Sequence, residues 1–370
     1  MGGARPPLVL LAAGGTGGHL FPAEALASAL KRRGIEVDLA TDERATRYGQ
    51  DFPARETHVI PSATIRARDP LSMAKTVATL GVGAMKALRL MNRIRPAAVV
   101  GFGGYPTLPP VLAATLRRIP TVIHDANAVM GRANRMLSSR VSAIATSFPG
   151  MTLDPPLAAK ASFTGNPVRP MVIQAAGEPY PALDDGDPIK LLVFGGSQGA
   201  RVMADIVPPA VEKLPPDLRA RLAVVQQARG EDETHVREAY ARLSVTAEVA
   251  PFFSDLPARI AAAHLIVSRS GASTVAELAA IGRPAILVPL PHALDQDQLA
   301  NANVLAKAGG AIVLKQDDFT PERLAGEIAR LAADPGQLPA MAAGAKSAGV
   351  LDAADRLADL VLRVANVVPR

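Results

Sequence analysis

Two glycine-rich stretches follow apolar runs at corresponding places in the two halves of the chain. The first is Gly14-Gly15-Thr16-Gly17-Gly18-His19, and the second is Gly195-Gly196-Ser197-Gln198-Gly199. Glycines let backbone N–H groups approach an anion, and the start of a helix favours negative charge. The first stretch lacks both the Lys-Ser/Thr of a Walker loop and the acid expected after a dinucleotide fingerprint. Either stretch alone could be a tight turn without a ligand, but two at equivalent positions favour phosphate binding.

His19 ends the first glycine-rich stretch, where a helix is expected to begin. Its side chain is a candidate general base because an unperturbed imidazole titrates near neutral pH. The alternative is a histidine that only caps the helix.

Hydroxyl groups and small side chains gather in Ser268-Arg269-Ser270-Gly271-Ala272-Ser273-Thr274-Val275-Ala276-Glu277, where a strand enters a helix. This composition suits an anion or a sugar hydroxyl at the start of the helix. Glu277, one turn further on, is placed to accept hydrogen bonds from a ribose diol. Arg169 lies near the inferred domain junction, where the alternative to ligand binding is a hinge salt bridge.

Metal and thiol chemistry are not indicated. Two short D-x-D strings occur, Asp185-Gly186-Asp187 and Asp295-Gln296-Asp297, but such strings are common and no His/Asp/Glu cluster has metal-ligand spacing. We therefore expect no metal and no cofactor. The chain has no cysteine, which excludes disulfides and thiol nucleophiles and fits a reducing compartment.

Short apolar runs alternate with helical patterns along the whole chain, which predicts an α/β protein with parallel sheets covered on both faces. At 370 residues, two domains are expected, each opening with one of the glycine-rich turns. Ligands bind beyond the carboxyl ends of such strands, so two facing domains would form a cleft. Expected strands cover residues 8–13, 37–41, 97–101, 121–124, 143–146, 190–194, 222–226, 247–250, 265–268, 285–289 and 311–314. Expected helices include residues 22–33 and 108–118.

Charge is unevenly distributed around a net value of +6. Residues 1–165 contain 20 basic and 10 acidic side chains, whereas residues 166–370 contain 20 and 24. Between Arg66 and Arg118 there are nine basic residues and one acid, Asp69. This bias predicts that the first half meets an anionic surface. Nucleic acid is a weak candidate because aromatic residues make up 4% of the chain and Trp is absent.

Residues 73–91 carry an apolar stripe at helical spacing, with basic side chains elsewhere on the helix. A basic amphipathic helix can lie on anionic lipid. The alternative is a stripe that faces the protein core, although the regional charge favours the membrane. Gly81 and Gly83 are expected to divide the segment into two helices. Neither a transmembrane segment nor a signal peptide is expected, which places the protein in the cytosol or on the cytosolic face of a membrane. The stripe consists of Met73, Val77, Leu80, Ala84, Leu88 and Met91.

The ordered set of motifs resembles the MurG family of bacterial glycosyltransferases over nearly the whole chain. Its members add N-acetylglucosamine to the lipid-linked muramyl-pentapeptide precursor of peptidoglycan. The matching strings are Gly14–His19 with Phe21-Pro22, Gly101-Phe102-Gly103-Gly104-Tyr105, His124-Asp125-Ala126-Asn127, Gly165-Asn166-Pro167-Val168-Arg169, Gly195–Ala200, Ser268–Glu277, and Gln298 with Asn301-Ala302.

The resemblance implies a GT-B fold: two Rossmann-like, doubly wound parallel-sheet domains with UDP-N-acetylglucosamine in the cleft between them. Residues 1–165 would form the acceptor and membrane-associated domain, and residues 166–349 the UDP-sugar domain. Residues 350–370 would contain a last helix that returns to the N-terminal domain.

The resemblance also implies roles for individual residues. The backbone near Phe253 would meet the uracil, Ser197 and Arg169 the phosphates, and Glu277 the ribose hydroxyls. Gln298 and Asn127 would contact the sugar. The turn formed by Thr16, Gly17 and Gly18 would lie near the acceptor diphosphate. The diphosphate and ribose region would be lined by Ala272, Ser273, Thr274, Val275 and Ala276.

The implied reaction is a metal-free, inverting displacement by the C4 hydroxyl of undecaprenyl-diphosphate-N-acetylmuramyl-pentapeptide, with UDP leaving. His19 would deprotonate or orient this hydroxyl, and Asp125 competes for the role of base. In this family Glu and Gln often stand where Asp125 and Ala126 stand here, so contacts at this string can differ. The implied location is the cytoplasmic face of the inner membrane, as a peripheral protein. Other cell-wall and division proteins are implied partners.

Three alternatives stay open. A diacylglycerol glycosyltransferase would use another lipid and another nucleotide sugar. A nucleotide-sugar epimerase with the same fold would not need a membrane-binding surface. A non-catalytic UDP-sugar-binding scaffold of cell-wall assembly would bind the donor without transferring the sugar.

Overall fold

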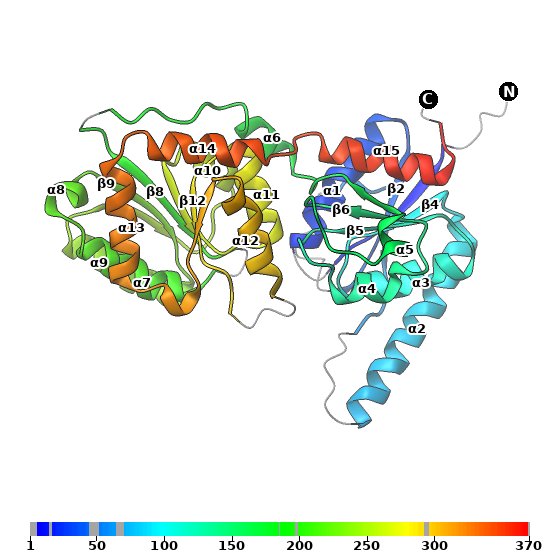
Figure 1. Cartoon of the computed structure of the whole chain (residues 1–370). Coiled ribbons are helices and arrows are strands. Elements are labelled where there is room, and N and C mark those ends of the chain that lie inside the picture. Colours follow the sequence, from blue (N-terminus) through cyan, green and yellow to red (C-terminus); the bar gives the residue numbers. More distant parts are fainter. Residues whose placement is uncertain are drawn as a thin grey trace. The chain divides into compact units, whose positions relative to one another are not determined.

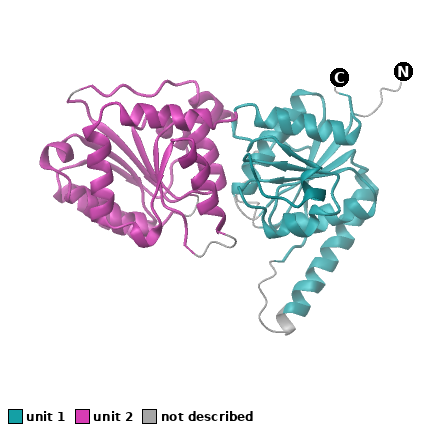
Figure 2. Cartoon of the chain, viewed as in Figure 1, with its two compact units in different colours: residues 1–169, 351–370 teal, residues 170–350 magenta. Residues whose placement is uncertain are grey.

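The computed structural model describes residues 6–14, 17–43, 52–63, 70–184, 186–196, 199–291 and 296–368. The chain divides into two compact units (Figure 2). The first contains residues 1–169 and 351–370, and the second contains residues 170–350.

The first unit is built on a seven-stranded sheet in the order β3-β2-β1-β4-β5-β6-β7, in which all pairs are parallel. Every residue of β1 is buried, as expected for a central strand with both faces covered. The strands are β1 (Leu8–Ala12), β2 (Glu36–Thr41), β3 (Thr57–Val59), β4 (Ala98–Gly101), β5 (Thr121–Asp125), β6 (Ala143–Thr146) and β7 (Ala161–Phe163). The helices are α1 (Gly17–Arg32), α2 (Pro70–Ile94), η2 (Tyr105–Thr107), α3 (Leu108–Leu116), α4 (Arg132–Ser138), α5 (Pro155–Ala158) and α15 (Ala353–Ala365).

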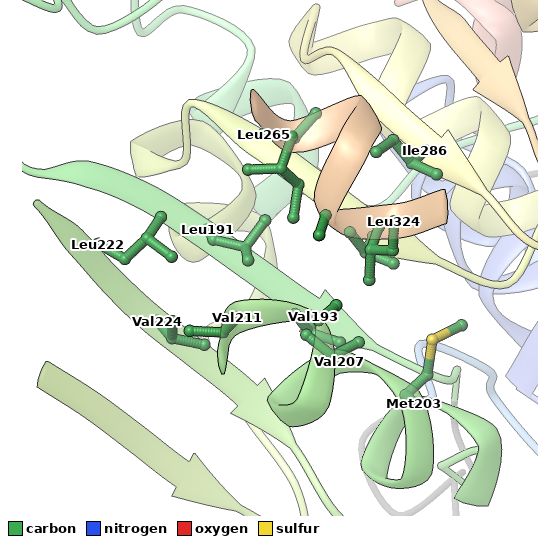
Figure 3. Packing of buried hydrophobic residues seen from close by; sticks show 14 of the residues in the cluster. Leu191, Val193, Met203, Val207, Val211, Leu222, Val224, Leu265, Ile286 and Leu324 are labelled. Carbon is green, nitrogen blue, oxygen red and sulfur yellow. The ribbon is translucent and has the colours of Figure 1, made fainter. Parts of the chain in front are cut away.

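The second unit repeats this design with a six-stranded parallel sheet in the order β10-β9-β8-β11-β12-β13. On one face, Val193 and Val224 pack with Val207 of α7 and Leu324 of α13 (Figure 3). The strands are β8 (Ile189–Phe194), β9 (Leu222–Gln227), β10 (Thr246–Ala250), β11 (Leu265–Ser268), β12 (Ala285–Leu287) and β13 (Ala311–Val313). The helices are α6 (Pro170–Ala175), α7 (Arg201–Glu212), α8 (Pro216–Ala220), α9 (Gly230–Arg242), α10 (Leu256–Ala262), α11 (Ala272–Ile281), α12 (Asp297–Lys307), η4 (Gln316–Asp318), α13 (Pro321–Ala333) and α14 (Gln337–Ser347).

The last helix of the chain, α15, packs beside α1 in the first unit (Figure 1). Leu357 and Val361 are fully buried in the same apolar cluster as Leu26 of α1. At the edge of this contact, the guanidinium of Arg33 lies 2.6 Å from Asp359. Burial of apolar surface therefore joins two segments more than 300 residues apart.

Two expected helix boundaries were wrong. Helix α1 begins at Gly17, five residues before Pro22, because a proline so near the start of a helix removes only the one backbone hydrogen bond that its own missing N–H would donate. Helix α2 is continuous and is not divided at Gly81 and Gly83. A Cβ at Gly83 would lie 2.2 Å from the carbonyl oxygen of Pro61, so this glycine allows a close approach of the helix. The three-residue strands β3 and β7 were not expected; they depend on pairing with β2 and β6.

The apolar stripe of α2 changes its surroundings along the helix. Met91 is buried in the core, whereas Met73 and Val77 are exposed, as are Val82 and Met85. The core-facing interpretation therefore holds for the C-terminal end only, and the N-terminal end extends away from the sheet (Figure 1). In the described part of the chain, no helix combines the length and apolarity needed to cross a membrane.

Candidate active site

The first glycine-rich turn connects the buried strand β1 to α1. A Cβ at Gly14 would lie 2.9 Å from side-chain oxygens of Thr41 and Asp42, so a larger residue would require these side chains to move. Gly17 and Gly18 occupy the first turn of α1, whose amide groups have no partners within the helix and can bind an anion. Thr16 lies outside the described residues.

His19, the third residue of α1, lies against the loop that follows β4. Cβ atoms at Gly103 and Gly104 would lie 3.4 and 3.2 Å from its imidazole, so these two glycines leave room for the ring. Burial lowers the pKa of His19, and a hydrogen bond to the backbone of Phe102 opposes this shift. Within the described residues Nδ1 is buried without a hydrogen-bond partner. His19 is therefore a neutral imidazole at pH 7, the protonation state of a base.

A second buried histidine lies beside this position, at the end of β5. His124 Nε2 lies 3.0 Å from the hydroxyl of Ser147 and 3.4 Å from the carbonyl oxygen of Gly165. Its ring packs against Phe102 with 5.4 Å between centroids. Burial lowers the pKa of His124 to about 4, so it is also neutral at pH 7. Two neutral rings can occupy this buried region without mutual repulsion.

Asp125 fixes the loop between β5 and α4. Its carboxylate accepts hydrogen bonds from the backbone N–H of Asn127 at 3.2 Å, from that of Gly131 at 2.8 Å and from Nδ2 of Asn134 at 3.0 Å. The side chain is 2% exposed. These three bonds occupy most of the lone pairs of the carboxylate and give Asp125 a structural role in this loop. Asn127 is only partly buried and has its backbone held by this carboxylate.

Arg169, the last residue of the first unit, reaches α1. Its guanidinium lies 4.2 Å from the centre of the Phe21 ring, a cation–π arrangement. Asn166, three residues before Arg169, is 4% exposed. Neither polar atom of its side-chain amide has a hydrogen-bond partner among the described residues. The first turn of α1 thus carries Gly17, Gly18 and His19. The same helix carries Phe21, whose ring contacts Arg169.

The second glycine-rich turn connects β8 to α7. A Cβ at Gly195 would lie 2.2 Å from the backbone nitrogen of Ala200, and Gly196 and Gly199 have φ values of +88° and +67°. The N–H of Gly195 donates to Oε1 of Gln227 at 3.0 Å. The turn therefore requires glycine for steric and conformational reasons. Ser197 lies outside the described residues.

The Ser268–Glu277 string forms the end of β11 and the start of α11. Ala272, Ser273 and Thr274 are half-buried in the first turn of the helix, and the buried hydroxyl of Ser273 has no hydrogen-bond partner among the described residues. Such a hydroxyl at a helix N-terminus suits an anionic ligand. The next three residues are less accessible: Val275, Ala276 and Glu277 are 1%, 9% and 7% exposed. Val275 can therefore offer a ligand little beyond its backbone.

Gln298 lies beside this turn at the start of α12. Its backbone carbonyl accepts a hydrogen bond from the hydroxyl of Ser270 at 2.8 Å, and its Oε1 accepts one from the N–H of Leu290 at 3.0 Å. The structure thus brings Gln298 together with the start of α11. Arg269, in the same turn, donates hydrogen bonds to the carbonyl oxygens of Val288 and Pro289, each at 3.1 Å.

Phe253 follows β10 in the second unit. Its ring is 8% exposed and lies under the guanidinium of Arg259, 4.3 Å from centroid to cation. The neighbouring Phe252 is 67% exposed. Because the Phe253 ring is covered, a ligand can reach this position mainly through the backbone.

Three positioning contacts were missed by reasoning from the sequence. They are the stacking of His19 on Gly103-Gly104, the hydrogen bond from Asn134 to Asp125, and the contact between Ser147 and His124. The glycine pair after a predicted strand was the available signal. Asn134 and Ser147 are isolated polar residues, and only the tertiary structure shows their partners.

Comparison with known families covers both units. The family model described as the glycosyltransferase family 28 N-terminal domain matches residues 9–146, and that of the family 28 C-terminal domain matches residues 190–357. An N-acetylmuramyl-(pentapeptide) pyrophosphoryl-undecaprenol N-acetylglucosamine transferase of Rhodopseudomonas palustris (strain BisA53) is 63% identical over 98% of this chain and 97% of the relative. The corresponding transferase of Nitrobacter hamburgensis is 60% identical over 98% of both chains.

Solved structures agree in architecture. The crystal structure of MurG from Acinetobacter baumannii superposes with a TM-score of 0.79 at 30% identity, covering 97% of this chain and all of the other. The calicheamicin glycosyltransferase CalG4 superposes with a TM-score of 0.67 at 17% identity, covering 99% and 100% of the two chains. At that identity the match reflects the fold alone. The predicted α/β architecture of the GT-B type is confirmed.

Proposed function

The chain belongs to glycosyltransferase family 28, among its MurG enzymes, and from this membership we propose the reaction that it catalyses. It transfers N-acetylglucosamine from UDP-N-acetylglucosamine to undecaprenyl-diphosphate-N-acetylmuramyl-pentapeptide, converting lipid I to lipid II in peptidoglycan synthesis. The observation that carries this conclusion is 63% identity over 98% of the chain, which includes both glycine-rich turns and the start of α11.

The chemical step is a single displacement with inversion at the anomeric carbon of the donor. The C4 hydroxyl oxygen of the muramyl sugar forms the new bond and loses its proton, while the bond to the UDP oxygen breaks. Negative charge increases on the leaving diphosphate. In this proposal the N-terminus of α11, the hydroxyl of Ser273 and the guanidinium of Arg169 stabilise that charge.

His19 deprotonates or orients the attacking hydroxyl. Two observations support this role: its pKa is lowered by burial, and its ring is held by Gly103 and Gly104. A neutral imidazole in a fixed orientation has a lone pair for the hydroxyl proton. Gly17 and Gly18, with Thr16, bind the acceptor diphosphate at the start of the same helix.

Donor binding belongs to the second unit in this proposal. The first turn of α11, from Ala272 to Ala276, and Ser197 meet the diphosphate and ribose region, and Glu277 binds the ribose hydroxyls. The backbone at Phe253 meets the uracil. Gln298 of the second unit and Asn127 of the first contact the transferred sugar.

The enzyme acts as a peripheral protein on the cytoplasmic face of the inner membrane. Support comes from the exposed apolar side chains of Met73, Val77, Val82 and Met85, which share α2 with several basic residues. Apolar side chains insert at the lipid interface while basic ones meet anionic headgroups. Association with other cell-wall and division proteins is part of the same proposal.

The test is transfer of labelled N-acetylglucosamine to the lipid-linked acceptor in the presence of EDTA. Wild type should transfer, and His19→Ala should lower kcat by about a hundredfold or more while it still binds UDP-N-acetylglucosamine. His235→Ala, on an exposed position of α9, is the control and should be unaffected.

Two results would contradict parts of the proposal. Full activity of His19→Ala would remove His19 as the base but keep the transferase. A wild type that binds the donor without transferring the sugar would point to another acceptor or to a non-catalytic scaffold.

A further inference from the structure

The last residue of β9, Gln227, lies between the ends of two strands that lead to segments of the proposed donor site. In the sheet order β10-β9-β8, strand β9 is the middle one. Gln227 is paired with Ala250, the last residue of β10, and the preceding Gln226 is paired with Val193 near the end of β8. Strand β8 leads into the second glycine-rich turn, and β10 leads into the segment that contains Phe253. A side chain at the end of β9 can therefore reach both segments.

The side-chain amide of Gln227 contacts both segments at once. Its Oε1 accepts a hydrogen bond from the N–H of Gly195 at 3.0 Å, and its Nε2 donates one to the carbonyl oxygen of Pro251 at 3.1 Å. Gln227 is 7% exposed. A primary amide carries an acceptor and a donor in one rigid plane, so this single group satisfies a donor in one segment and an acceptor in the other. The amide thereby joins the two segments.

The glycine-rich turn is closely packed where Gln227 holds it. A Cβ at Gly195 would lie 2.2 Å from the backbone nitrogen of Ala200, and the N–H of Gly199 donates to the carbonyl oxygen of Gly196 at 3.0 Å. The N–H of Gly195 is already bonded to Gln227, so a phosphate has to use other groups of the turn. Gln227 therefore fixes the orientation of the first peptide of this turn.

The segment after β10 is held on both sides of Phe252. Gln227 binds the carbonyl oxygen of Pro251, and the ring of Phe253 packs under the guanidinium of Arg259. A backbone held in this way presents its N–H and C=O groups in fixed directions. Uracil offers a ring N–H donor beside a carbonyl acceptor, whereas cytosine offers a ring nitrogen acceptor beside an amino donor. A fixed peptide that pairs with uracil leaves polar groups unpaired against cytosine.

The neighbouring glutamine has contacts of a different kind. Gln226 is fully buried and points to the other face of the sheet, as alternation along a strand requires. Its Nε2 donates to the carbonyl oxygen of Met203 at 3.2 Å, and its Oε1 accepts from the hydroxyl of Tyr240 at 2.5 Å. Neither partner belongs to the glycine-rich turn or to the segment around Phe253. Gln226 therefore supports the core, while Gln227 connects two segments of the donor site.

We propose that Gln227 is a positioning residue for the donor. It fixes the backbone that meets the nucleobase relative to the turn that meets the diphosphate, and so contributes to the selection of a uridine over a cytidine nucleotide. It acts through Gly195 and Pro251 and does not itself touch the ligand. This inference rests on the donor site proposed above.

The test uses three variants of the full-length protein. Gln227→Met removes both hydrogen bonds, and Gln227→Glu keeps an acceptor for Gly195 but, when ionised, cannot donate to Pro251. Gln226→Met is the matched control, because it also removes two buried hydrogen bonds one residue away. Urea unfolding first shows that each variant is folded. Calorimetric titration with UDP and with CDP then gives two dissociation constants for each protein.

The ratio of the CDP to the UDP dissociation constant is the decisive quantity. Both ligands carry the same diphosphate, so an added charge or a smaller folded fraction affects them equally and leaves the ratio unchanged. Gln227→Met should bind UDP roughly thirtyfold and CDP only about threefold more weakly than wild type, so the ratio falls about tenfold. Gln227→Glu should lower the ratio similarly. Gln226→Met should lose stability and keep the ratio of wild type.

Two results would overturn the proposal. An unchanged ratio in Gln227→Met and Gln227→Glu would mean that Gln227 supports the fold only, whatever happens to stability. The same conclusion follows if Gln226→Met lowers the ratio as much as Gln227→Met does. Failure of the underlying donor site looks different, because the wild type itself would then bind UDP no better than CDP, and the inference would fall with it.

Discussion

The guanidinium of Arg169 lies 4.2 Å from the centre of the Phe21 ring, so the last residue of the first unit is held against the first helix. A cation over an aromatic face is stabilised by about 0.5 to 2 kcal/mol. Phe21 stands two residues after His19 on α1. This contact links the position of the proposed phosphate-binding arginine to the helix that carries the proposed base.

Phe21→Leu should therefore weaken binding of UDP-N-acetylglucosamine. Leucine keeps an apolar side chain but removes the π face that orients Arg169, and we expect a dissociation constant roughly three- to tenfold higher. Calorimetric titration of the donor measures the change. In an Arg169→Ala background the same substitution should have no further effect, because its target is gone. Equal losses in both backgrounds would mean that Phe21 acts independently of Arg169.

Activity should persist below the pH at which an ordinary histidine is protonated. Burial lowers the pKa of His19 from 6.5, so the neutral form persists at pH 6.5 and the acid limb of kcat/KM lies below that pH. The measurement is kcat/KM between pH 5 and 8 with saturating donor. An acid limb centred at or above pH 6.5 would contradict the assignment of His19 as a buried base.

Stability has to be measured over the same range, because the buried histidines also affect folding. Near pH 6.5 the unfolded chain takes up a proton that His124, with a pKa of about 4, does not accept in the folded protein. The free energy of unfolding therefore falls as pH decreases from 6.5 towards 4. Urea unfolding at each pH separates this loss of folded protein from the titration of His19.

Two serines at the start of α11 should respond in opposite ways to replacement by alanine. Ser273→Ala removes a buried hydroxyl that has no hydrogen-bond partner among the described residues, so the free energy of unfolding should stay the same or rise by up to about 1 kcal/mol. Donor affinity should fall roughly tenfold if this hydroxyl binds the diphosphate. Ser270→Ala, which loses the 2.8 Å bond to Gln298, should cost about 1 to 2 kcal/mol of stability. Unchanged donor affinity in Ser273→Ala would remove Ser273 from the site.

Two glycines of α2 provide a test of the close contact between this helix and the chain after β3. At Gly83 a Cβ would lie 2.2 Å from the carbonyl oxygen of Pro61, so Gly83→Ala should lower the free energy of unfolding by about 1 to 3 kcal/mol. At Gly81 a Cβ meets no atom of the described residues within 4 Å, so Gly81→Ala should raise the free energy of unfolding by about 0.5 to 1 kcal/mol. Urea denaturation measures both. A stabilised Gly83→Ala variant would show that the helix does not pack on Pro61.

The sequence alone was sufficient to predict the α/β class, most of the strands and both glycine-rich turns. These features depend on local information: runs of apolar residues mark buried strands, and glycine marks turns with a close approach or a positive φ. Gly103 and Gly104 could be read from the sequence, but their contact with the imidazole of His19 could not. Strands β3 and β7 escaped prediction because three residues have no period of their own and depend on a neighbouring strand.

Only the tertiary structure decided how the candidate site residues are held. In a parallel sheet the carboxyl ends of the neighbouring strands β1, β4 and β5 lie side by side. His19 therefore contacts a loop more than 80 residues away in the sequence. Asp125 accepts a hydrogen bond from Asn134 in the helix that follows β5. The same folding buries both imidazoles, which lowers their pKa values. It also places Arg169 on Phe21. Burial and long-range contact are properties of the folded chain, whereas residue type and local spacing are properties of the sequence.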